Sequence, residues 1–158
     1  MKMHSKIIQV SRTPLVFDDY VEEDAFYDNF ACWIADYVDD DVCPEVRKDV
    51  IDGFIHMFGS DITTEWDEND GTSFIVAEGW KDVFAAQRLQ YAREYLARAT
   101  VDDMKTGNVV YELEKYLGDP FGVYIYENGC LTMLVRWLCE RMREGVRYYF
   151  GAVVDYHY

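Results

Sequence analysis

The chain has 158 residues, 50% of them apolar and 16% aromatic, so it is expected to bury a core as a single domain over residues 1–158 rather than to be intrinsically disordered. Its net charge of −15 disfavours binding to nucleic acid or to anionic membranes, because like charges repel. No uncharged stretch approaches the about 20 residues of a membrane span, and the N-terminus has no apolar core of signal-peptide length, so a cytoplasmic protein is expected.

Hydrophobic periodicity predicts alternating strands and helices in the first half of the chain. In chain order we expect a strand over Lys6–Val10, a helix over Val21–Val38, a helix from Pro44 to Gly59, and a hairpin of Ile62–Trp66 with Thr72–Ala77. The aromatic residues of the first helix recur at helical spacing. The buried face of the second helix is expected to contain Val46, Val50, Phe54, Met57 and Phe58.

The second half is expected to be mainly helical until a final strand. Its predicted elements are helices over Trp80–Ala99 and Val109–Leu117, a strand over Val123–Tyr126, a helix over Leu131–Glu144 and a strand over Arg147–Tyr156. The inward face of the helix from Trp80 is expected to contain Phe84, Leu89, Ala92 and Leu96. Together these elements predict an α+β fold, an antiparallel sheet of about four or five strands with three or four helices packed on it.

The turn at Asn128-Gly129 carries two conflicting signals. Asn-Gly is typical of a tight hairpin, which predicts a strand after it. The following apolar residues recur at helical rather than alternating spacing, and this spacing decides the prediction of a helix there.

The negative charge is confined to one segment of the sequence. Residues 1–17 carry three basic residues and no acid, and residues 83–158 carry ten acids and nine bases. Residues 18–82 carry 20 acids against three bases, a net charge of −17. A field of one sign attracts cationic surfaces, over a distance that the ionic strength sets.

The acidic residues of this segment are the candidate binding residues. On the helix from Pro44, three carboxylates at i, i+4 and i+7 form one stripe, which His56 continues. Others lie on the preceding segment and at the tip of the hairpin. The candidate partner-binding set is Asp24, Asp28, Asp39, Asp40, Asp41, Glu45, Asp49, Asp52, Glu65, Asp67, Glu68 and Asp70.

No catalytic, cofactor or metal motif is recognised in the sequence. With Gly71 at position 6 of a calcium loop, Trp66 would stand at position 1, where an acidic ligand is needed. The four cysteines show no zinc spacing, and Cys43, beside Asp41 and Glu45, lacks the setting of a reactive thiol. We therefore expect no catalytic residue, no cofactor and no metal, although a loose divalent-cation site at Asp39–Asp41 or Asp67–Asp70 stays an alternative.

The spacing of the acids predicts imitation of nucleic acid. Helix neighbours at i and i+4 stand roughly 5–6 Å apart, of the order of the phosphate repeat along a strand. In composition alone, the chain resembles the DNA-mimic inhibitors that phages and mobile elements use against restriction and CRISPR nucleases. The resemblance implies an anti-CRISPR or anti-restriction factor whose partner is a basic nucleic-acid-binding protein or nuclease, acting in a phage-infected or mobile-element-carrying bacterium, with no direct binding to nucleic acid or membrane.

Other functions stay open at this point. An immunity protein or antitoxin that neutralises a basic nuclease needs the same carboxylate face, with aromatic anchors such as Trp66 and Tyr37. A small enzyme with paired carboxylates, or an acidic face that only aids solubility, is also compatible with the composition. The sequence further leaves open a homodimer in which the tyrosine-rich C-terminal strand pairs with another copy.

Overall fold

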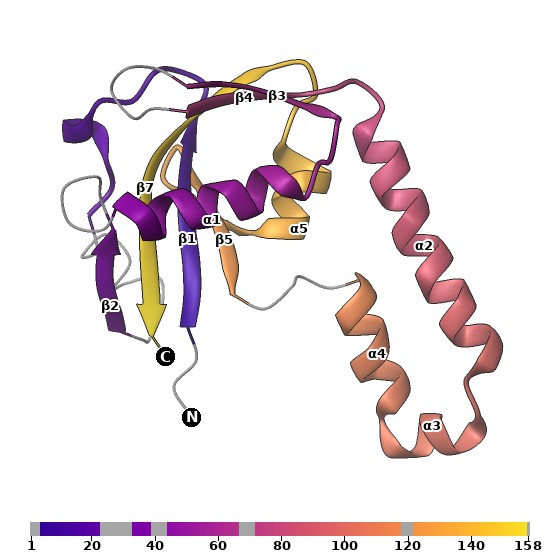
Figure 1. Cartoon of the computed structure of the whole chain (residues 1–158). Helices are drawn as coiled ribbons and strands as arrows, with labels where there is room; N and C mark the ends of the chain where they lie inside the picture. Colours follow the sequence, from indigo (N-terminus) through magenta and orange to yellow (C-terminus); the bar gives the residue numbers. More distant parts are fainter. Residues whose placement is uncertain (1–3, 23–32, 39–43, 67–71, 118–121, 158) are drawn as a thin grey trace.

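The computed structural model describes residues 4–22, 33–38, 44–66, 72–117 and 122–157. Two parts are distinguished in Figure 1: a body, in which helices pack on a sheet, and a helical arm that extends away from it. The strands are β1 (His4–Ser11), β2 (Trp33–Val38), β3 (Ile62–Trp66), β4 (Thr72–Val76), β5 (Val123–Glu127), β6 (Cys130–Met133) and β7 (Arg147–His157). The helices are α1 (Pro44–His56), α2 (Trp80–Arg98), α3 (Val101–Thr106), α4 (Asn108–Leu117) and α5 (Leu134–Arg136), with a 3-10 turn η1 (Phe17–Asp19) and a π-helical turn η3 (Trp137–Arg141).

The sheet is mostly antiparallel and β7 lies inside it. Six strands follow the order β3-β4-β7-β1-β5-β6, and β2 also pairs with β7. Among the described strands only β1 and β5 run parallel. The α+β prediction is thus confirmed as a class, whereas the predicted four or five strands and three or four helices were too few.

Gly151 marks a break in the pairing on both sides of β7. On one side β4 pairs with β7 up to Tyr149 and β2 pairs from Val153 onward, and in the gap Arg47 donates to the Gly151 carbonyl from Nε at 3.3 Å and Nη2 at 3.1 Å. On the other side, at a bulge in β1, Gln9 Oε1 accepts from the Ala152 N–H at 3.1 Å. A Cβ at residue 151 would stand 2.5 Å from Gln9 Oε1, so a larger residue there would have to displace the Gln9 side chain, which accepts from Val21 and Ala152 and donates to Asp19.

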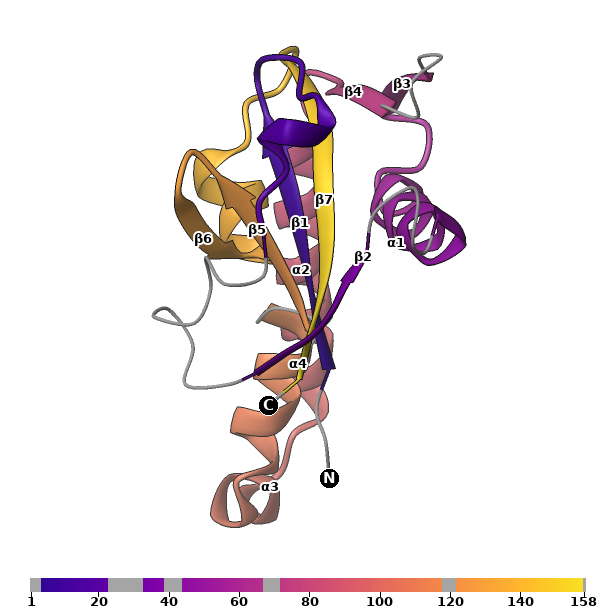
Figure 2. The same cartoon turned by 90° about the vertical axis from the view of Figure 1, so that its left-hand side faces the viewer.

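Two clusters of buried side chains lie against the sheet. The larger joins the strands to α1 and α5, and Phe54 of α1 has its ring centroid 5.2–5.5 Å from those of Phe58, Phe74 and Phe150. The smaller cluster contains Tyr20 and lies under the segment that includes η1. Figure 2 shows the sheet nearly edge-on, with α1 on one side of β7 and η1 on the other.

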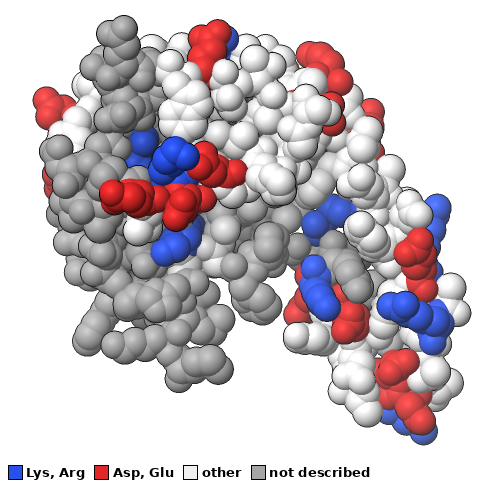
Figure 3. Space-filling view, in the orientation of Figure 1, with Lys and Arg blue, Asp and Glu red and all other residues white. Residues whose placement is uncertain are grey.

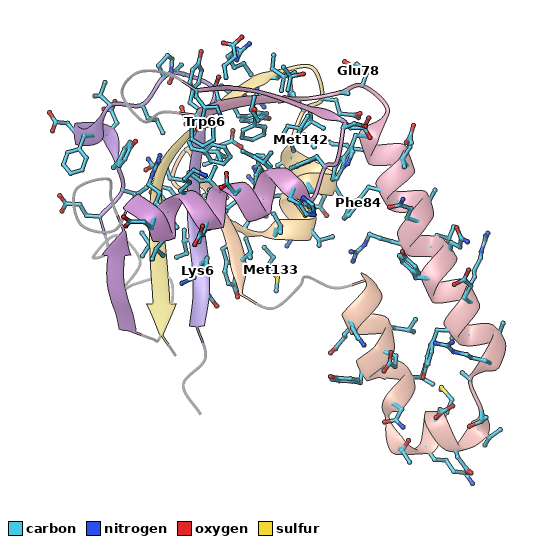
Figure 4. All side chains as sticks on the ribbon, in the orientation of Figure 1. Lys6, Trp66, Glu78, Phe84, Met133 and Met142 are labelled. Atoms are coloured by element: carbon cyan, nitrogen blue, oxygen red, sulfur yellow. The ribbon has the colours of Figure 1, made fainter. Side chains whose placement is uncertain are left out.

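The arm consists of α2, α3 and α4, residues 80–117. Trp80 ties it to the body, with its ring centroid 4.6 Å from that of Phe58 and 4.7 Å from that of Phe84. Figure 4 shows Phe84 on the side of α2 that faces the body. Beyond this first turn, α2 packs mainly on α4, which returns antiparallel to it (Figure 1).

Two predicted helices are wrong in part. Within Val21–Val38, the residues Trp33–Val38 form β2, residues 21–22 are not helical, and 23–32 lie outside the described residues. Within Leu131–Glu144, the chain first forms β6, because Asn128 and Gly129 both take positive φ (50° and 76°), as a tight hairpin requires. Helix begins only at Leu134, and the short helix α3 was not predicted.

Candidate functional site

The predicted acidic stripe lies on the outer surface of α1. The helix is oriented by a buried face of Arg47, Ile51 and Phe54, at i, i+4 and i+7, and Phe58, two residues past its end, continues this face. This face is turned by one residue from the predicted one, and Val46 is exposed rather than buried. Glu45 and Asp49 are exposed and Asp52 is half-buried, so the stripe faces solvent.

One carboxylate of the stripe is already paired within α1. Lys48 Nζ lies 2.7 Å from Asp52 Oδ2, one helical turn away. The hydrogen bond and the attraction to this carboxylate raise the pKa of Lys48 above its ordinary value, and Asp49 adds to the effect. Among the described residues no cation pairs with Glu45 or Asp49, so these two carry the free negative charge of the stripe.

The β3–β4 hairpin brings a fourth candidate near α1. Glu65 of β3 has Oε2 3.3 Å from Arg147 Nη1, and Arg147 also donates to Ser73 Oγ at 2.7 Å. The next residue, Trp66, is 54% exposed, and Lys48 Nζ lies 5.9 Å from its ring centroid. Figure 4 shows Trp66 on the side of the hairpin that faces α1. A cation–π contact thus connects the two elements that hold Glu45, Asp49, Asp52 and Glu65.

The remaining predicted site residues cannot be compared with this surface. Tyr37, a predicted anchor, lies in β2 rather than in a helix. The following candidates lie outside the described residues: Asp24, Asp28, Asp39, Asp40, Asp41, Asp67, Glu68 and Asp70.

The net charge of the sequence lies outside the arm. The arm, residues 80–117, contains six basic and six acidic residues, so its net charge is zero. The whole net charge of −15 therefore belongs to the rest of the chain, with 24 acids against nine bases. Figure 3 shows acidic and basic side chains side by side both on the arm and over the part of the body where α1 lies.

Arg47 is the structural residue of this region that sequence reasoning missed. It is only 3% exposed, and its guanidinium also donates to the Tyr20 hydroxyl at 3.4 Å. Its spacing of four and seven residues from Ile51 and Phe54 was the available signal, since this places it on the apolar face.

A pocket of about 320 Å³ lies on the other face of the sheet, beside Gln9, Leu15, Asp19 and Tyr126. Gln9 is fully engaged there: Nε2 donates to the Asp19 carbonyl at 3.0 Å and Oε1 accepts from the Val21 N–H at 2.8 Å. Asp19 Oδ2 accepts from the Val16 N–H at 3.1 Å. These polar groups hold the segment around η1, and Asp19 is the single carboxylate among the pocket's lining residues.

The described residues were also searched for metal and membrane features. No group of three or more His, Cys, Asp or Glu side chains gathers within them as metal ligands would. Cys130 and Cys139 are free thiols, while Cys32 and Cys43 lie outside the described part. In the described chain, no helix combines the length and apolarity needed to cross a membrane.

Comparison of the chain with protein-family profiles, with curated proteins and with solved structures found no match. The function must therefore be argued from the surface itself.

Proposed function

We propose that this protein is a binding protein, not an enzyme, whose acidic body imitates nucleic acid and occupies the cationic cleft of a nucleic-acid-binding protein or nuclease. A role as an anti-CRISPR or anti-restriction factor of a phage or mobile element fits this proposal. The observation that carries it is the division of charge along the sequence, with a neutral arm at residues 80–117 and a net charge of −15 on the rest of the chain. A surface charged only for solubility would have no need of this separation.

The best-placed carboxylates for such a contact are Glu45 and Asp49. They stand one helical turn apart, exposed, on a helix anchored by Ile51 and Phe54 in the core. At roughly 5–6 Å, their spacing is of the order of neighbouring phosphates on a strand. Because the core already holds the helix in place, its backbone would lose little conformational entropy on binding.

Asp52 and Glu65 contribute less to this surface than the sequence suggested. Each already has a cation of the same chain beside it, Lys48 and Arg147. A partner's arginine or lysine would have to displace or share that cation. Trp66, half exposed between the two pairs, offers an aromatic anchor at the edge of the acidic surface.

An immunity protein or antitoxin against a basic nuclease would use the same surface. The two roles differ only in the identity of the nuclease, and the same capture experiment separates them. The described pocket gives little support to the enzyme alternative, because its one carboxylate, Asp19, already accepts a hydrogen bond from the Val16 N–H.

The test is capture of partners from a nuclease-containing bacterial lysate at low and high salt, followed by inhibition of the captured nuclease. We expect Glu45→Lys/Asp49→Lys to abolish capture and inhibition, and excess duplex DNA to displace the partner, because both would occupy one cleft. The matched control, Glu94→Lys/Glu140→Lys, changes the net charge equally outside residues 18–82 and should keep full inhibition. Equal loss in both variants, or unchanged inhibition in the first, would contradict the proposal.

A further inference from the structure

The strand β3 ends the sheet with an open edge. It is the terminal strand in the order β3-β4-β7-β1-β5-β6, and β4 is the one described strand that pairs with it. This pairing runs without a bulge from Ile62 with Val76 to Trp66 with Thr72. Figure 2 shows β3 at the outer end of the sheet, on the side where α1 lies. The tyrosine-rich strand β7, by contrast, is paired on both sides, so it offers a further strand no such edge.

Every second residue of β3 points its backbone groups to this edge. The Ala77 N–H donates to the Asp61 carbonyl at 2.7 Å, which makes these two residues a hydrogen-bonded pair of the antiparallel ladder. Because such pairs recur at every second residue, Thr63 and Glu65 also bond to β4. The residues between them turn their N–H and C=O groups outward, and they are Ile62, Thr64 and Trp66. Within the described chain no hydrogen bond to these outward groups is found.

The side chains of β3 alternate between two faces that a further strand would extend. On the face toward α1, Ile62 packs on the larger buried cluster and Trp66 is 54% exposed beside Lys48. On the opposite face lie Asp61 and Glu65, and the side chain of Glu65 is 68% exposed. A further strand would therefore meet an apolar and aromatic surface on one face and carboxylates on the other.

The charge of the chain around β3 is acidic. Between Lys48 and Lys81 the sequence holds eight acids and no lysine or arginine. Glu65 is paired with Arg147, whereas no cation among the described residues pairs with Asp61. This charge favours a strand that carries lysine or arginine. It disfavours a second copy of this chain, because the β3 of that copy would bring the same acids to the edge.

We propose that the open edge of β3 binds an extended, basic segment of a partner protein, which adds to the sheet as a further antiparallel strand. Backbone hydrogen bonds to the outward groups of β3 fix the geometry of this contact. Lysine or arginine at alternate positions of the segment lies beside Asp61 and Glu65, and the apolar side chains between them lie beside Ile62 and Trp66. The segment belongs to the same nuclease or nucleic-acid-binding protein, and in this respect the inference rests on the proposed function.

A synthetic peptide of alternating lysine and valine, long enough to span β3, tests the proposal on the full chain. We follow the amides of β3 by NMR while the peptide is added. The amides that should become protected from hydrogen exchange are those of Ile62, Thr64 and Trp66. The amides of Thr63 and Glu65 should change little, because they already bond to β4.

Modified peptides separate strand addition from mere attraction between charges. In the proposed antiparallel pairing, the valines face α1 and turn their N–H groups to β3, whereas the lysines turn theirs outward. N-methylation of the valines should therefore weaken binding about 100-fold, and N-methylation of the lysines should leave it nearly unchanged. Equal effects of the two methylations, or effects in the reverse order, would overturn the proposal. Equally tight binding of a peptide with its lysines and valines in two separate blocks would also overturn it.

A change in the chain itself gives an independent test. Thr64→Pro removes the central outward N–H without removing a bond to β4, and Thr64→Val is the matched control that keeps this N–H. We expect the proline variant to bind the alternating peptide about tenfold more weakly and the valine variant to bind it as the natural chain does. Circular dichroism checks that both variants keep the fold.

Two further results decide the occupant of the edge. Protection of the outward amides that grows with chain concentration in the absence of peptide would assign the edge to a second copy and overturn the proposal. Equal binding of the peptide by both Thr64 variants would show that the acids only guard the edge. Inhibition by the Glu45→Lys/Asp49→Lys chain is measured without the peptide, so the proposed function and the strand addition fail on different results.

Discussion

The body and the arm are held together in different ways. In the body, the aromatic rings of Phe54, Phe74 and Phe150 are almost fully buried and contact one another across α1, β4 and β7. In the arm, Ala92, Tyr95 and Val109 are buried between the helices, whereas Leu89 and Leu96 stay half exposed. The arm is neutral, and the rest of the chain carries a net charge of −15.

The packing of each part limits what its surface can hold in a fixed position. A fully packed core can hold a surface of like charges in a fixed position, because the burial of apolar area outweighs the modest repulsion at the surface. A hairpin of helices buries less apolar area per residue than a sheet covered by helices. The body can therefore hold charged side chains in fixed positions, whereas the arm leaves apolar side chains in contact with water.

The largest expected effect is the difference between a core residue of the body and an apolar residue of the arm. Phe54→Ala should lower the free energy of unfolding by about 3–5 kcal/mol, because it leaves a cavity among four neighbouring aromatic rings. Leu89→Ala should cost about 1 kcal/mol or less in dilute solution, because half of that side chain is already in water. Urea unfolding of both variants measures the difference.

The exposure of Leu89 makes this comparison decisive. Equal costs for the two substitutions in dilute solution would show that the arm is packed as tightly as the body, contrary to its exposure.

The sequence predicted the elements whose signals are local. The hairpin of Ile62–Trp66 with Thr72–Val76 and the helix α1, which begins at Pro44, follow from turn residues and from spacing within about ten residues. β2 was misread because its partner, β7, lies more than 100 residues away, and pairing with a distant strand overrides helical spacing. The half-exposed leucines of α2 were misread for a related reason, because spacing shows that a face is apolar and not what covers it.

The candidate site was predictable only in part. The surface position of Glu45 and Asp49 follows from the period of α1. The ion pair of Glu65 with Arg147 joins residues 82 apart, so the sequence around neither residue could predict it. Arg47 shows the same limit. Its place on the apolar face could be predicted from the sequence. Its hydrogen bond to the Gly151 carbonyl, 104 residues away, could not.

The second prediction compares two arginines, one in each part. Arg47→Met should destabilise the body by about 1–3 kcal/mol, because the Gly151 carbonyl loses both of its guanidinium donors in the gap between β4 and β2. Arg93→Met in the arm should change stability by no more than about 0.5 kcal/mol in dilute solution, because this side chain is exposed. Thermal unfolding measures both, and amide exchange near Gly151 locates the first. If Arg47→Met is neutral, water or a neighbouring group serves that carbonyl equally well.

The smallest effect concerns the pH dependence of the arm at α3. Asp103 Oδ2 accepts from the Thr100 N–H at 2.8 Å and from its hydroxyl at 3.0 Å, and Thr100 Oγ1 accepts from the Asp103 N–H at 3.2 Å. The two bonds to its carboxylate, first from the backbone and then from the hydroxyl, lower the pKa of Asp103 below its ordinary 3.8. A lowered folded pKa means that the stabilisation of α3 is present above pH 3.8 and is lost as the pH falls through the folded value.

Carbon chemical shifts of α3 should follow this titration, with Val101–Thr106 losing helical character as the pH falls below 3.8. Asp103→Asn is the control, because an amide can still accept from Thr100 but does not titrate in this range, so its α3 should show no such step. A titration midpoint of Asp103 at or above 3.8, or the same step in the amide variant, would mean that the capping bonds do not hold α3 in place.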